Sequence, residues 1–176
     1  MIGNPAYTGT LITAQGSGSA LTNSTTPTSL LPAAAKYTIP ANGIAYIGQK
    51  LKIRAWGSIT TTTGTNNITL TIYMGGSVLY ASQAIVALAS LTGSTWMAEF
   101  DLTCQTLGAS ANFAVSGIAY GLTAVNAVTL IPATSPTTTS TFNSATANVL
   151  DFYGTWSTAS SSDSITLTQF EVISSN

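Results

Sequence analysis

Alternation of apolar and polar residues at every second position is the feature that most constrains this chain. It is clearest in the segment Gly48–Gly57, GQKLKIRAWG. In an extended strand, successive side chains point to opposite faces. The basic residues of the segment therefore share one face and its aliphatic residues share the other: Lys50, Lys52 and Arg54 against Leu51, Ile53 and Ala55. The segment predicts a strand with one apolar face.

The segment 96–104, WMAEFDLTC, repeats this pattern with the opposite charge, because Glu99 and Asp101 share its polar face. Opposite charges on facing strands contribute about 0.2–1 kcal/mol per pair and help to fix the register. We therefore predict that Lys50, Lys52 and Arg54 face Glu99 and Asp101, either within one sheet or across a subunit boundary. The alternative is that these charges only keep one outer face wet.

Further strand-like segments follow along the chain, with almost no helical periodicity. Asn67–Tyr80 is the clearest, because Gly75-Gly76 between its apolar runs suits a two-residue hairpin turn. Pro40–Gly43 predicts another turn, and Ser82–Leu91 is the one segment whose pattern allows a short helix. Other segments with a strand-like pattern are 10–14, 29–31, 36–39, 44–47, 50–62, 95–106, 112–121, 127–131, 148–157 and 164–173.

About eight to ten strands at this spacing predict an all-β fold, namely an antiparallel β-sandwich, with a jelly roll as the preferred topology. We expect residues 1–176 to form one domain, with residues 1–9 as an extended N-terminal arm. Parity assigns Trp96, Trp156 and Cys104 to the core. Gly48 and Gly57 are expected at bends or bulges.

Charge is scarce in this chain. Charged residues make up 5% of it, the net charge is −1, and hydrophobic residues make up 45%. Ordinary soluble proteins have roughly 25% charged residues, and net charge helps to keep them dispersed. We therefore expect a free monomer to associate and much of its surface to be covered in a permanent assembly.

The residue inventory argues against several functions. The chain has no histidine, and Cys104 is its single cysteine, so histidine triads, intrachain disulfides and cysteine metal clusters are absent. Glu99 and Asp101 lie two residues apart on one strand, whereas glycosidase acids flank a bond across a cleft. We expect no enzyme activity, no cofactor and no metal.

Nucleic acid and membrane are also not expected as partners. Three clustered basic residues in a chain of pI about 4.9 fall short of a nucleic-acid footprint. The longest apolar run, Ala84–Leu91, is too short to span a bilayer. Met1–Thr8 lacks the pattern of a secretory signal, so we expect synthesis in the cytoplasm without export.

Trp56 has three possible interpretations. It shares the polar face with Lys52 and Arg54, and a tryptophan beside an arginine is typical of an interface anchor. The same position would suit a platform on which a sugar stacks. A bulge near Ala55 would instead return Trp56 to the core.

Four segments resemble small virion proteins of tailed bacteriophages: Leu30–Asn42, Ile47–Gly57, Asp101–Cys104 and Ser164–Ile173. Proteins of that group are described as minor capsid, decoration or tail-associated proteins. The resemblance implies a β-sandwich displayed on the phage particle, without enzyme activity, assembled as a homotrimer and with other virion proteins. It implies no individual site residues, and head, neck and tail positions stay open.

Two other functions compete with this one. The first is a glycan-binding module on a phage tail or bacterial surface, with an aromatic platform drawn from Trp56, Tyr46, Tyr73 and Tyr80. The second is a structural subunit of a fibre, sheath or surface layer of cellular origin.

Overall fold

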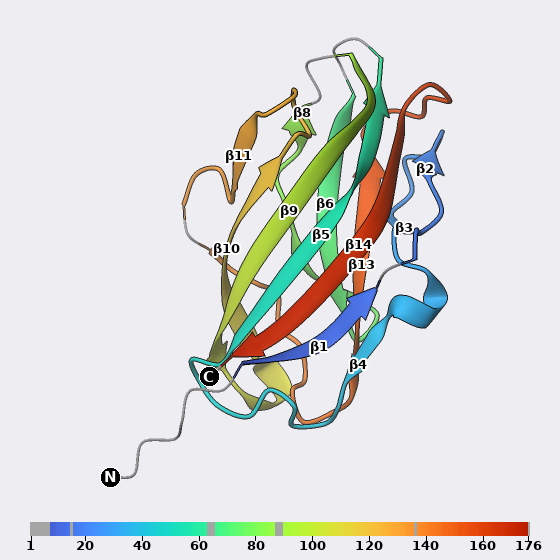
Figure 1. Cartoon of the computed structure of the whole chain (residues 1–176). Helices are drawn as coiled ribbons and strands as arrows, with labels where there is room; N and C mark the ends of the chain where they lie inside the picture. Colours follow the sequence, from blue (N-terminus) through green and yellow to red (C-terminus); the bar gives the residue numbers. More distant parts are fainter. Residues whose placement is uncertain (1–7, 15, 63–65, 87–89, 136, 176) are drawn as a thin grey trace.

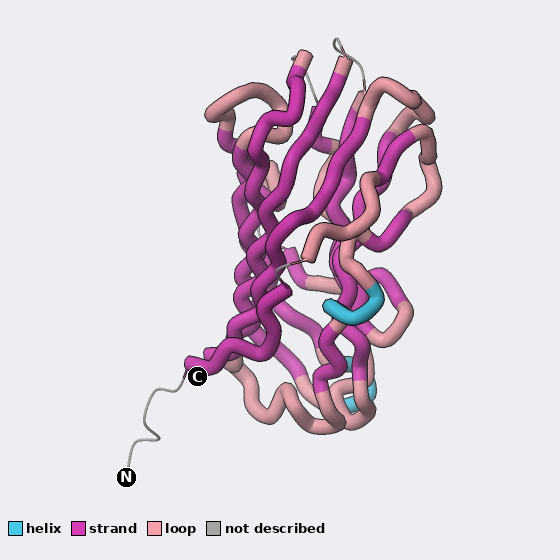
Figure 2. Tube along the Cα trace, turned by 45° about the vertical axis from the view of Figure 1, so that its right-hand side comes forward, coloured by secondary structure: helices cyan, strands magenta, loops and turns pink. Residues whose placement is uncertain are grey.

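Two antiparallel β-sheets form the structure, which is a computed structural model describing residues 8–14, 16–62, 66–86, 90–135 and 137–175 (Figure 1). Helical structure in these ranges is limited to two 3-10 turns, η1 (Ala33–Ala35) and η2 (Gly108–Ser110). The expected all-β sandwich is confirmed. Figure 2 shows the strands in two layers, with the longest strands together in one of them.

The first sheet, sheet A, runs in the order β1-β14-β5-β9-β10-β11, with β2 paired to β14 and β12 paired to β10. Its strands are β1 Thr8–Ala14, β2 Leu21–Thr22, β5 Lys50–Thr61, β9 Leu91–Thr106, β10 Asn112–Tyr120, β11 Val128–Ile131, β12 Thr137–Thr138 and β14 Ser164–Ser175. Thr8 and Gly9 already pair with the end of β14. The rest of the expected arm, residues 1–7, lies outside the described residues.

The second sheet, sheet B, runs in the order β3-β13-β6-β7, with β4 paired to β13 and β8 paired to β6. Its strands are β3 Thr28–Ser29, β4 Tyr37–Ile39, β6 Asn67–Met74, β7 Ser77–Ala81, β8 Ile85–Val86 and β13 Asn148–Trp156. The expected hairpin joins β6 to β7, and positive φ angles of 62° at Gly75 and 82° at Gly76 suit its tight turn.

Eight of these strands pair in a nested order. β1 pairs with β14, β3 with β13, β5 with β9, and β6 with β7. In sheet A, β14 also pairs with β5, which joins the β1–β14 pair to the β5–β9 pair. In sheet B, β13 also pairs with β6, which joins the β3–β13 pair to the β6–β7 pair. The strands β10 to β12 come between β9 and β13 in sequence and extend sheet A at its edge.

The inner faces of both sheets enclose one hydrophobic cluster. Trp96 and Trp156 are buried in it, and each indole N–H is bonded. Trp96 Nε1 donates to the carbonyl groups of Ser58 and Thr166, at 3.2 and 3.3 Å, and Trp156 Nε1 donates to Leu21 at 3.1 Å. Cys104 is buried and free. The expected core positions of these three residues are confirmed.

One expected strand is wrong, and the segment whose pattern allowed a helix is not helical where it is described. Residues 44–47 form an irregular loop instead of a strand. The buried amide of Gln49 binds this loop: Oε1 accepts from the N–H of Ala45 at 2.7 Å, and Nε2 donates to the carbonyl of Gly43 at 3.1 Å. A side chain thus satisfies backbone groups that a sheet would otherwise pair. In Ser82–Leu91 the described residues are not helical and include β8, while residues 87–89 lie outside the described ranges.

Gly57 is not a bulge, which corrects another expectation. β5 alternates without interruption, and the irregularity lies opposite it in β14, between Leu167 and Gln169. A Cβ on Gly57 would lie 1.8 Å from the carbonyl oxygen of Thr166, so close approach of the backbones requires glycine here. Gly48 does lie in a turn, with a φ of 92°.

Candidate functional site

The basic residues of β5 and the acidic residues of β9 meet on the outer face of sheet A, as neighbours within one sheet. The register places Lys52 opposite Asp101 and Arg54 opposite Glu99. Lys52 Nζ lies 2.8 Å from Glu99 Oε1 and 3.4 Å from Asp101 Oδ1. Arg54 Nε lies 2.7 Å from Glu99 Oε2. Glu99 therefore bridges the two cations.

The network extends to a third strand that the sequence prediction did not include. Arg54 Nη1 lies 3.4 Å from Glu171 Oε2 in β14, on the other side of β5. In the sequence, the only indication was that Glu171 alternates with apolar residues, which predicts that it lies on the outer face of its strand. Lys50 faces Thr103 and makes no ion pair with any described residue, so it stands outside this network.

The ion pairs hold Glu99 in its charged form. Burial alone would raise the pKa of Glu99, but hydrogen bonds from Lys52 and Arg54 outweigh burial and lower the pKa below its ordinary value. The hydrogen bond to Glu99 raises the pKa of Lys52, against the opposite effect of burial. The charges of this network are thus largely neutralised inside the chain.

Trp56 lies on the same outer face, in line with Lys52 and Arg54 and half-buried. The interpretation that returned it to the core is wrong, because β5 contains no bulge. Cross-strand pairing forms an apolar row in which Trp56 faces Met97, Met97 faces Tyr120, and Tyr120 faces Val128. This row runs directly beside the ion pairs.

The row ends in an exposed apolar patch at β10, β11 and the turn between them. We call it the β10–β11 patch, and it consists of Tyr120, Val125, Val128 and Leu130. The side chains of Val125, Val128 and Leu130 are 65%, 56% and 63% exposed. Contiguous exposed apolar residues rimmed by polar ones mark interaction surfaces. The alternation of apolar and polar residues in the sequence had not distinguished the residues of this patch from core residues.

The outer face of sheet B carries a different arrangement, which sequence reasoning missed. Asp151 is buried in β13, where it forms an ion pair with Lys36 at 2.6 Å. Its Oδ1 also accepts from the hydroxyl of Ser29 at 2.6 Å and from the N–H of Phe152 at 2.8 Å. In the sequence, the only indication of this ion pair was that Asp151 lies within an apolar strand and that Lys36 is an isolated lysine.

Two tyrosines pack beside this buried pair. The rings of Tyr73 and Tyr153 stack with centroids 4.1 Å apart. They line an open hollow of about 420 Å³ together with Lys36, Asp151 and the Gly75-Gly76 turn. These two tyrosines of sheet B thus stack on each other and are half-buried, as Trp56 is on sheet A.

The four aromatic residues proposed for one sugar platform do not come together. Trp56 lies on the outer face of sheet A and Tyr73 on that of sheet B. Tyr80 is buried at the edge of sheet B, and Tyr46 lies in the loop near the end of β14. A platform built from all four is therefore wrong, because their strands place them on different faces.

Nearly all charge in this chain is bound internally. Seven of the nine charged side chains form ion pairs. Asp163 instead accepts hydrogen bonds from Asn66 and Thr62. Burial would raise the pKa of Asp163, but these hydrogen bonds outweigh it and lower the pKa. Within the described ranges, no three His, Cys, Asp or Glu side chains gather to hold a metal, and no helix is long and apolar enough to cross a membrane.

No protein-family model and no curated protein matches this chain. Among solved structures, it is similar to the CBM2 module of the evolved Dit of Lactobacillus casei BL23 phage J-1, with a TM-score of 0.36 and 10% identity over 78% of this chain and 67% of that one. It is also similar to chains of the infectious bursal disease virus Gx strain and of the infectious bursal disease virus VP2 subviral particle. Their TM-scores are 0.29 and 0.28, at 15% and 13% identity over 97% of this chain.

The chain spans only 36% and 42% of those two viral chains. Similarities of this size identify neither a shared fold nor a shared function.

Proposed function

We propose that this chain is a non-enzymatic structural subunit of a tailed-bacteriophage virion, displayed on the particle surface as a capsid decoration or minor capsid protein. It is made in the host cytoplasm and assembles with copies of itself and with other virion proteins. The resemblance of Leu30–Asn42 and the other three segments supports the phage origin. The observation that carries self-association is the exposed β10–β11 patch beside an internally neutralised network.

The nested strand pairing supports a jelly-roll topology for this subunit. Numbered one to eight, the strands β1, β3, β5, β6, β7, β9, β13 and β14 run 1-8-3-6 in sheet A and 2-7-4-5 in sheet B. This is the order obtained when a long two-stranded ribbon folds over into two facing sheets of four, as in a jelly roll. On this interpretation the whole chain is one domain and β10 to β12 are an insertion in it.

The chemistry of the sheet A face fits a contact between subunits. Tryptophan, tyrosine, methionine and arginine are enriched at the centres of protein interfaces, while isolated charges are depleted there. Trp56, Met97 and Tyr120 form such a centre, and Arg54 enters it with its charge already paired. Since few unpaired charges remain on the surface, little repulsion opposes the approach of another copy.

A ring of three copies would cover this face. A head-to-tail contact that closes by rotation buries the same two patches in every copy and leaves no open end. A homotrimer is therefore the assembly that we propose, with Trp56 and the β10–β11 patch inside the contact.

The assembly is tested by measuring mass with multi-angle light scattering on the wild type and on Val128→Glu/Leu130→Glu. We expect the wild type to have the mass of three chains. The variant should be a monomer with an unchanged circular dichroism spectrum, because two buried carboxylates would oppose the contact. The matched control is Val78→Glu/Val149→Glu, which places the same charges on exposed valines of sheet B and should remain trimeric.

A monomeric wild type at high concentration, or a variant that still assembles, would refute the proposed contact. The virion assignment is tested separately, by mass spectrometry of purified phage particles from the source of this sequence. If this protein were absent from the purified particles, the virion assignment would be refuted, whereas the proposed contact between subunits would be unaffected.

A further inference from the structure

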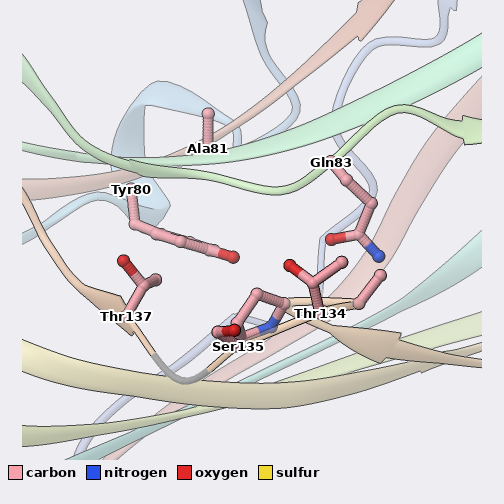
Figure 3. A pocket seen from close by; sticks show the side chains of 8 residues that line it. Tyr80, Ala81, Gln83, Thr134, Ser135 and Thr137 are labelled. Atoms are coloured by element: carbon pink, nitrogen blue, oxygen red, sulfur yellow. The ribbon is translucent and has the colours of Figure 1, made fainter.

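The edges of the two sheets enclose an open hollow of about 480 Å³ that has no part in the proposed contact (Figure 3). One wall comes from β7 and the segment after it, and the other from residues 132–135 and Thr137. Its lining residues are Tyr80, Ala81, Gln83, Pro132, Ala133, Thr134, Ser135 and Thr137. None of them is charged, and five of them present a hydroxyl or an amide.

Gln83 lies in the wall of this hollow and carries a hydrogen-bond acceptor without a partner. Its Nε2 donates to the carbonyl of Leu130 at 2.7 Å, and this bond fixes the orientation of the amide because only the nitrogen can donate. Its Oε1 is buried and is the one such side-chain N or O atom without a hydrogen-bond partner among the described residues. Figure 3 shows this oxygen facing the hydroxyls of Tyr80 and Thr134. Buried acceptors are normally paired, so this one would gain a partner if the side chains that cover it moved aside for a donor in the hollow.

Tyr80 supplies a rigid second group. Its ring is buried and packs edge-on against Phe100, with centroids 6.3 Å apart, so its position is fixed by the core. Burial raises the pKa of the Tyr80 phenol, which therefore stays neutral and can both donate and accept. Figure 3 shows its hydroxyl pointing toward the middle of the hollow.

We propose that this hollow binds a neutral, hydroxyl-rich ligand, namely one pyranose ring of a glycan. Sugar hydroxyls donate and accept, as the amide of Gln83 and the hydroxyls of Tyr80, Thr134, Ser135 and Thr137 require. The volume is in the range of small-ligand pockets.

The chemistry of the lining argues against other ligand classes. An anion would find no cation among the lining residues, and a cation would find no carboxylate. A purely apolar ligand would leave Gln83 Oε1 unpaired. The small apolar side chains of Ala81, Pro132 and Ala133 instead suit the C–H face of a sugar ring.

This site differs from the platform around Trp56 that was one interpretation of the sequence, because the hollow lies at the sheet edges and Trp56 on the outer face of sheet A. It does not rest on the virion assignment. A host-surface glycan and a free sugar would both present a neutral, hydroxyl-rich ring, so the experiment must distinguish these two sources.

The experiment is a titration of the ¹⁵N-labelled full chain followed by NMR. The probes are the methyl glycosides of glucose, galactose, mannose, rhamnose and N-acetylglucosamine, with methyl glucuronide as a charged probe. At least one neutral glycoside should shift the amide signals of Tyr80, Gln83, Thr134 and Ser135. Tyr80→Phe, which keeps the ring, should weaken Kd about fivefold, and Gln83→Met about tenfold.

The matched controls are Tyr73→Phe and Gln105→Met, at two residues that do not line this hollow, which should leave Kd unchanged. A glycan array then separates the two sources: retention of an oligosaccharide that ends in the preferred sugar, lost in Tyr80→Phe, indicates a surface glycan.

The proposal fails if no neutral glycoside shifts these signals, including the case in which a crystal structure finds only a water on Gln83 Oε1. It also fails if the shifts centre on Trp56, if the charged probe alone binds, or if Tyr80→Phe binds as tightly as the wild type. If Gln83→Met does not fold, the Kd of Tyr80→Phe alone decides whether the proposal holds.

Discussion

The outer faces of the two sheets both carry ion pairs, but they use them differently. On sheet A, five charged residues spread over three strands, and their side chains are 18% to 40% exposed. On sheet B, one lysine meets one carboxylate that is only 7% exposed. Exposed pairs stabilise little individually, whereas removing one partner of a buried pair leaves a costly buried charge. We therefore expect the sheet A network to contribute mainly to register and neutrality, and the sheet B pair to contribute more to the free energy of folding.

The aromatic residues show the same contrast. Tyr73 and Tyr153 stack on each other and line an open hollow together with Lys36 and Asp151. Trp56, Met97 and Tyr120 form a row that ends in exposed aliphatic side chains. The two tyrosines of sheet B pack on each other, whereas the row of sheet A continues into the exposed β10–β11 patch that we propose as a contact.

The largest effect should come from Lys36→Met, which leaves Asp151 buried without its cation. We expect a loss of about 3 kcal/mol in the free energy of unfolding, measured with urea at neutral pH. Lys50→Met is the matched control and should cost less than about 0.5 kcal/mol, since Lys50 is exposed and forms no ion pair with a described residue. Equal costs would mean that Ser29 and the Phe152 N–H suffice for Asp151, and the contrast between the sheets would disappear.

Lys52→Glu should have an intermediate effect, about 1–2 kcal/mol. The change removes two attractive contacts, to Glu99 and Asp101, and replaces them with repulsion across the ladder. Lys52→Glu/Asp101→Lys restores one opposite pair and should recover part of the loss. An unchanged melting temperature and assembly mass in the single variant would show that these charges only solvate the face.

Acid should weaken sheet A through protonation of Glu99. Its pKa in the folded chain lies below its ordinary value of 4.5. The stability that it contributes is therefore fully present above that ordinary value and is lost as the pH falls through the lower folded value. Thermal melts from neutral pH to about pH 3 should show a shallower decline for Glu99→Gln than for the wild type. Parallel declines would assign the acid sensitivity to other carboxylates, such as Asp163.

The smallest effect should come from Glu171→Gln, about 0.3 kcal/mol, because Arg54 keeps its shorter contact with Glu99. This difference should vanish in about 1 M salt, where exposed charges are screened. The cost of Lys36→Met should persist in the same buffer. A salt-resistant effect at Glu171 would show that the network is more buried than its exposure indicates.

Much of the fold could be predicted because side-chain parity is a local property. The one-sided strands at Lys50–Thr61 and Leu91–Thr106 and the hairpin turn at Gly75-Gly76 follow from residues close together in sequence. The loop at 44–47 was missed because the amide of Gln49 competes with strand pairing there. The alternation of apolar and polar residues does not reveal where a side chain binds backbone groups in place of a neighbouring strand.

The candidate sites were less predictable for a related reason. Glu99 and Asp101 could be matched to Lys52 and Arg54 because both strands carry charge at the same spacing. Lys36 and Asp151 offered no such pattern, and they lie far apart in sequence.

The sequence by itself determined which side of each strand is apolar, how little charge the surface can carry and which common catalytic chemistries are absent. Only the tertiary structure decided which strands are neighbours, that sheet A exposes its β10–β11 patch, and that Gln83 and Tyr80 meet Thr134 across the sheet edges. The physical reason is range: alternation is set by adjacent residues, whereas neighbours in a sandwich are set by how the whole chain closes around one core.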